Sequence, residues 1–166
     1  MAGFTLQKEC VIARAPDVVR AHFLDFQHHI RHEVHKGVRY EVLQHDDEGA
    51  RQRVRSRFRV MGMPKVDEIR TYVTPSGDVV QDFERGDFAG GNLRVRVEEE
   101  RPGVSHLYAT FDVPLRGINR LIGGVVRRTV SKIADQAIEE DRLDLESGYT
   151  PPPGLLRAMA SVMGKS

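Results

Sequence analysis

Residues 104–145 read VSHLYATFDVPLRGINRLIGGVVRRTVSKIADQAIEEDRLDL, and the spacing of their apolar side chains changes once, near Gly117. Before that point, from about residue 38, apolar and polar residues alternate, which is typical of strands with one buried face. After it, from Ile118 to Leu145, the apolar residues recur at helical spacing. One stripe of this helix carries Val126, Val130, Ile133, Ala137 and Asp141. Strands closed by one long helix predict an α+β fold in which a curved sheet wraps around the helix and leaves a cavity.

The rest of the chain supplies further strands and one earlier helix. Phe4–Arg14 reads as a first strand, and Pro16 followed by Asp17 is a favourable start for a helix that runs to about Ile30. Six more strands are expected at 38–45, 51–61, 65–74, 78–83, 92–101 and 104–113. Because the turns between them are short, neighbouring strands should pair antiparallel in a sheet of six to seven strands.

Composition narrows the class of protein. The 166 residues suit a single domain, and 25 basic against 24 acidic side chains leave a net charge of +1. This balance, together with the absence of Trp, argues against a nucleic-acid partner. Cys10 has no partner for an internal disulfide, and no apolar stretch is long enough to cross a bilayer. We therefore expect a cytoplasmic protein.

A change of composition after Gly148 divides the chain. Residues 1–148 form the expected ligand-binding domain, and 149–166 form a Pro-rich linker with a short amphipathic tail. The apolar stripe of this tail consists of Leu155, Leu156, Met159, Val162 and Met163. The tail is expected to contact its own domain, a partner or a membrane surface.

The order of elements over residues 4–147 resembles the START-like superfamily, also called helix-grip or polyketide cyclase/lipid-transport proteins. The local resemblance lies in Ala15-Pro16-Asp17-Val18-Val19 and in the strand that begins Gly37-Val38-Arg39-Tyr40. This resemblance implies a cavity between the sheet and the C-terminal helix that binds a hydrophobic small molecule, either a lipid, a polyketide or an aromatic compound. We expect its walls to include Phe58, Leu93, Val95, Phe111, Val126, Val130 and Ile133.

Five of the seven histidines lie between His22 and His35, and on a continuous helix His28 and His32 could bind one divalent ion. With Asp141 they resemble the two-histidine, one-carboxylate iron site of the catalytic domain in Rieske-type ring-hydroxylating oxygenases, although no Rieske domain is present and the histidine spacing differs. His29 and His35 are alternative ligands. The resemblance implies an Fe(II) or Zn(II) enzyme, oxygenase-like or hydrolytic, as an alternative to a carrier. The simpler interpretation is that the histidines form the solvated face of an amphipathic helix.

Overall fold

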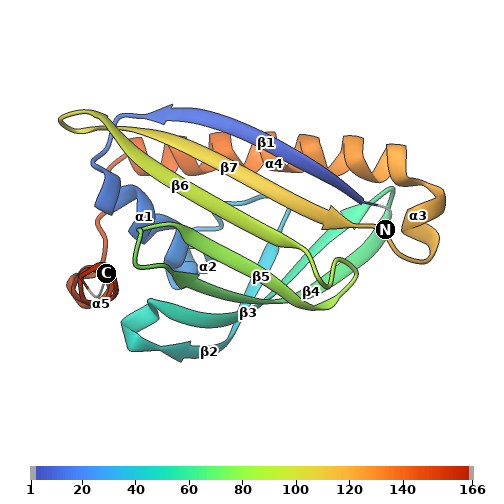
Figure 1. Cartoon of the computed structure of the whole chain (residues 1–166), viewed down its shortest axis with the longest axis horizontal. Coiled ribbons are helices and arrows are strands. Elements are labelled where there is room, and N and C mark those ends of the chain that lie inside the picture. Colours follow the sequence, from blue (N-terminus) through green and yellow to red (C-terminus); the bar gives the residue numbers. More distant parts are fainter. Residues whose placement is uncertain (1–2, 165–166) are drawn as a thin grey trace.

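A computed structural model describes residues 3–164 and contains a seven-stranded antiparallel sheet (Figure 1). The order across the sheet is β1-β7-β6-β5-β4-β3-β2, so every strand pairs with its neighbour in the sequence except that β1 pairs with β7. The strands are β1 (Gly3–Ile12), β2 (Arg39–Asp46), β3 (Arg51–Val60), β4 (Met63–Val73), β5 (Val79–Gly86), β6 (Asn92–Arg101) and β7 (Val104–Pro114). The curved sheet expected from the alternating residues is confirmed.

The long helix α4 (Gly123–Glu146) follows a single short turn of helix, α3 (Ile118–Leu121). It runs alongside the β1–β7 side of the sheet (Figure 1). Val126, Val130, Asp141 and Leu145 are its buried residues, as the helical stripe requires. The α+β helix-grip arrangement is therefore present.

The helix expected over residues 17–30 is divided in two. α1 (Pro16–Leu24) ends at Asp25, and α2 (Phe26–Arg31) begins directly after it. Asp25 has a non-helical ψ of 69°, and its carboxylate accepts a hydrogen bond from the backbone N–H of His28 at 3.1 Å. Asp is a favoured N-cap, so it begins a second helix that points in a new direction. Ile30, at the end of the expected helix, is 38% exposed as a result.

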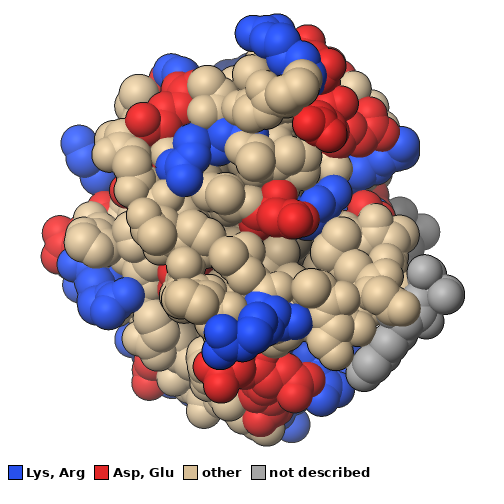
Figure 2. All heavy atoms as spheres, turned by 90° about the vertical axis from the view of Figure 1, so that its left-hand side faces the viewer, with Lys and Arg blue, Asp and Glu red and all other residues tan. Residues whose placement is uncertain are grey.

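The segment after α4 folds back onto the domain. Its helix α5 (Pro153–Met163) lies at one end of the molecule and contacts α1 and the 3₁₀ turn η1 (Asp47–Gly49) (Figure 1). Leu155 and Met159 are buried there. Basic and acidic side chains are interspersed on the surface at this end (Figure 2). None of the helices within residues 3–164 combines the length and apolar composition needed to cross a membrane.

Candidate functional site

The sheet and α4 enclose a cavity of about 140 Å³. Six of the expected wall residues line it, namely Phe58, Leu93, Val95, Phe111, Val130 and Ile133. Val126 does not. It is fully buried at the start of α4, in an apolar cluster that includes Val60 and Leu115 and fills the space between this helix and the sheet. The walls are otherwise dominated by aromatic and branched aliphatic side chains, as in most small-molecule sites.

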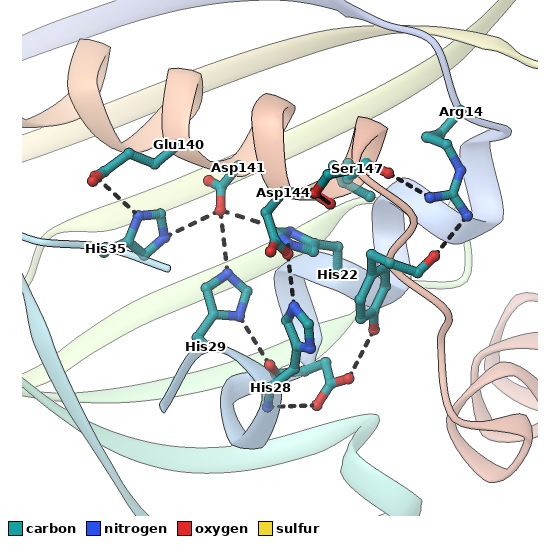
Figure 3. A network of polar contacts seen from close by, with 12 residues as sticks. Arg14, His22, His28, His29, His35, Glu140, Asp141, Asp144 and Ser147 are labelled. Carbon is teal, nitrogen blue, oxygen red and sulfur yellow. Dashed lines mark hydrogen bonds and ion pairs between the residues drawn. The ribbon is translucent and has the colours of Figure 1, made fainter. Parts of the chain in front are cut away.

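One part of the cavity lining is polar, because His29, His35 and Asp141 meet there; Lys8, Tyr40, Ser56 and Gln81 are the other polar residues of the lining. Asp141 points inward since it lies one helical turn beyond Ala137, which also faces the cavity. His29 comes from α2, and His35 comes from the loop before β2. We call His22, His29, His35 and Asp141 the inner cluster (Figure 3).

In the inner cluster, three imidazoles surround one carboxylate oxygen. Asp141 Oδ1 lies 3.1 Å from His35 Nε2, 3.2 Å from His29 Nε2 and 3.6 Å from His22 Nδ1. Although burial alone would raise the pKa of Asp141, the neighbouring His35, His29 and His22 hold it well below its usual range. Asp141 is therefore an anion at neutral pH, although it is only 3% exposed.

The protons on two of these imidazoles are determined by their other contacts. His29 Nδ1 lies 2.9 Å from the backbone carbonyl oxygen of Asp25, which can only accept, so this nitrogen donates. His22 Nε2 lies 2.8 Å from Asp144 Oδ2 and donates in the same way. In its neutral form, His22 then presents a lone pair toward Asp141 from Nδ1. His29 Nε2 forms a hydrogen bond with Asp141 Oδ1, so it would present a lone pair only if it gave up that proton, as it would on binding a metal ion. His22 Nδ1 is buried without a hydrogen-bond partner among the described residues.

Burial and neighbouring charges shift the pKa values of His22, His35 and Asp144 in different directions. Burial lowers the pKa of His22, more than its acidic neighbours raise it, so this imidazole is neutral at pH 7. Burial opposes the charge on His35 as well, but Asp141 and Glu140 outweigh it and raise its pKa. The bonds from His22 and His28 lower the pKa of Asp144 to about 2. Two anions thus flank a neutral His22.

The structure does not bring the first predicted ligand set together. His28 Nε2 lies 2.7 Å from Asp144 Oδ2 rather than beside Asp141. His32 is exposed at the end of α2, where its ring lies 4.5 Å from that of His28. The prediction assumed one continuous helix, and the break at Asp25 redirects both side chains. The alternative residues, His29 and His35, do meet Asp141.

Sequence reasoning missed His22 and Asp144 as members of the site, and it missed the support from Tyr149. The phenol of Tyr149 donates to Asp25 Oδ2 at 2.8 Å. Asp144 could have been found, because it lies three residues after Asp141 and so shares its side of the helix. No signal in the sequence marks the bond between Tyr149 and Asp25.

No protein-family model and no curated protein matches the sequence. Solved structures do match. A START superfamily protein from Mycobacterium smegmatis is similar with a TM-score of 0.67 at 16% identity, over 87% of this chain and 99% of that one. The chain therefore has the START-like helix-grip fold. A protein of Thermus thermophilus is similar with a TM-score of 0.66 at 19% identity, over 95% and 98% of the two chains. The Zhui aromatase/cyclase from a Streptomyces species is similar with a TM-score of 0.62 at 16% identity, over 90% and 100%.

Proposed function

We propose that this protein binds a small apolar molecule that carries one polar, oxygen-bearing group. The observation behind the proposal is the cavity itself, with apolar walls and a polar part made by His29, His35 and Asp141. Apolar walls supply affinity through the area they remove from water, and the few polar groups set the orientation.

The size of the cavity favours a compact ligand. A volume of about 140 Å³ is close to that of an engineered protein cavity of about 150 Å³ that takes up one benzene molecule. A ligand with one aromatic ring or a short branched chain is therefore favoured over a long lipid or a multi-ring polyketide. The polar group of the ligand would lie against His29, His35 and Asp141, the polar side chains that meet in the cavity lining.

Native mass spectrometry of freshly purified protein tests this proposal, because a co-purified molecule identifies the ligand class directly. A thermal-shift series with phenol, a naphthol and a long-chain fatty acid then tests the size limit. We expect stabilisation by the single-ring compound and little or none by the fatty acid. If neither a co-purified ligand nor any shift is found, ligand binding in this cavity is refuted.

The second candidate function is that of a mononuclear metalloenzyme, and the convergence of His22, His29 and Asp141 favours it. The facing atoms of His22, His29 and Asp141 lie within 4.8 Å of one another. Two metal–ligand bonds of about 2.0–2.1 Å at a tetrahedral angle separate their donor atoms by roughly 3.4 Å. The separations of 3.2 Å and 3.6 Å from Asp141 to His29 and His22 fit this value.

Their other contacts also suit metal ligands. A metal-binding histidine usually donates its second N–H to a carboxylate or a backbone carbonyl. His22 does so to Asp144, and His29 does so to Asp25. A bound Fe(II) or Zn(II) ion would act as a Lewis acid on the polar end of the ligand, and His35 would orient the Asp141 carboxylate.

Elemental analysis of protein purified without a histidine tag, before and after anaerobic iron or zinc loading, tests the metal site. We expect near-stoichiometric metal in the wild type and its loss in His29→Ala, while the exposed His32→Ala serves as the matched control and keeps it. A protein that takes up no metal under these conditions is a carrier or a metal-independent enzyme.

A further inference from the structure

The end of the molecule opposite α5 carries an unbalanced positive charge. Residues 115–134 contain no Asp or Glu, but they contain five cations, namely Arg116, Arg120, Arg127, Arg128 and Lys132. All five are exposed, and none forms an ion pair with another residue in the described range 3–164. We call the exposed residues of α3 and of the first turns of α4, together with Met61 in the β3–β4 turn, the α3 end.

Large apolar side chains are exposed among these cations. Leu121 is 82% exposed, Met61 63% and Ile118 58%. Lys65, near the start of β4, donates to the side chain of Asn119 in α3 at 2.8 Å. This bond holds α3 against the β3–β4 hairpin, so the two groups of apolar side chains belong to one surface. Scattered exposed apolar residues are ordinary, but a cluster of this kind usually marks a contact site.

The sheet provides a contrast, because many of its arginines face carboxylates. Several arginines of the sheet are paired with carboxylates, as in the contacts of Arg55 with Glu68 at 3.1 Å and of Arg70 with Asp82 at 3.2 Å. Around α5, both signs of charge are mixed (Figure 2). A net charge of +1 therefore conceals a local excess of cations at the α3 end.

We propose that the α3 end docks on an anionic membrane surface. Cations near a negatively charged bilayer are attracted to it, and aliphatic side chains among them can enter the interface. A second copy of the chain fits less well, because a symmetric contact would bring the same cations together. Nucleic acid also fits less well, since the exposed apolar residues of this end are aliphatic or Met and offer no aromatic ring for bases to stack on.

Co-sedimentation with two kinds of vesicle tests the proposal. One kind is pure phosphatidylcholine, and the other contains about a third phosphatidylserine. We expect binding to the anionic vesicles only, weakened by salt. Each basic residue near such a surface strengthens binding by about fivefold, so the double variant Arg120→Glu/Arg128→Glu should bind at least 25-fold more weakly. Leu121→Ser should weaken binding by about tenfold.

Matched controls lie away from the α3 end. The double variant Arg31→Glu/Arg157→Glu makes the same charge change at exposed positions on α2 and α5, and Leu143→Ser removes an apolar side chain that is 55% exposed near the end of α4. These controls should bind like the wild type. The proposal is overturned if the control variants lose as much vesicle binding as the α3-end variants, or if the protein binds neutral and anionic vesicles equally well. It is also overturned if the protein binds single-stranded RNA but not vesicles. Because no cavity ligand is needed, the result is independent of the proposed function.

Discussion

Filling the cavity with a larger side chain should abolish ligand binding without lowering the stability of the fold. Ala137→Leu is the substitution that tests this expectation. Ala137 faces the cavity from α4, one turn before Asp141. A leucine there adds three carbon atoms within the space that we assign to the ligand. The helix should accept it, because Leu and Ala are both strong helix formers.

The magnitude follows from burial and from ligand linkage. Burying three carbons contributes about 2.4 kcal/mol at about 0.8 kcal/mol each, less about 1–3 kcal/mol if the added group crowds its neighbours. The free energy of unfolding should therefore stay within about 1 kcal/mol of the wild type or rise by up to 2 kcal/mol. A ligand at about 100 times its Kd stabilises the wild type by about 2.7 kcal/mol. For a chain of this length, that corresponds to a rise in Tm of roughly 5–11 °C.

Urea unfolding gives the free energy, and thermal unfolding with and without the best single-ring compound gives the ligand effect. We expect Ala137→Leu to unfold like the wild type or at higher urea while its ligand-induced Tm shift disappears. Ala160→Leu makes the same change at an exposed position on α5 and should keep the full shift. If Ala137→Leu retains the ligand shift, the ligand does not occupy this cavity.

Three further variants test the buried polar groups. Burial raises the pKa of Asp67 to about 6, so stability should fall as pH rises from about 4 to 6, where the native carboxyl keeps a proton that the unfolded chain has lost. Asp67→Asn should remove this pH dependence and raise the free energy of unfolding at pH 7 by up to about 3 kcal/mol. Urea unfolding from pH 4 to 8 measures both effects, and an unchanged pH dependence would contradict the raised pKa of Asp67. Asp141→Asn removes the anion that faces three imidazoles and should cost about 3–5 kcal/mol in urea at pH 7, and a loss below 1 kcal/mol would mean that the cluster is not charged as described. Tyr149→Phe removes the hydrogen bond to Asp25 and should cost about 1–2 kcal/mol, while Thr150→Ala, beside it and exposed, should cost less than 0.5 kcal/mol.

The fold was accessible from the sequence because it depends on repeated local patterns. The alternation before Gly117 and the helical spacing after it are each supported by many residues, so errors at single positions do not change the outcome. The expected strand 92–101 coincides with β6, and 104–113 differs from β7 only by the terminal Pro114. The same helical spacing correctly placed Asp141 on the buried side of α4.

The site was harder to predict from the sequence than the fold, because it depends on contacts of single residues. One non-helical residue, Asp25, redirects α2 and exchanges which histidines are buried. His22 is fully buried, and its contacts to Asp141 and Asp144 join residues more than one hundred positions apart. Periodicity within a segment carries no information on such contacts. The preference of Asp for N-cap positions was the available sign of the break, and the prediction of one continuous helix did not use it.

Asp25 also connects α2 with the segment that follows α4. Its carbonyl oxygen faces His29 Nδ1, one carboxylate oxygen caps α2, and the other receives the phenol of Tyr149. The polar part of the cavity lining is thus held in place partly by a residue that follows the last long helix. A chain shortened at Gly148 would keep every cavity-lining residue and still lose the hydrogen bond from Tyr149 to Asp25, the residue whose carbonyl oxygen orients His29.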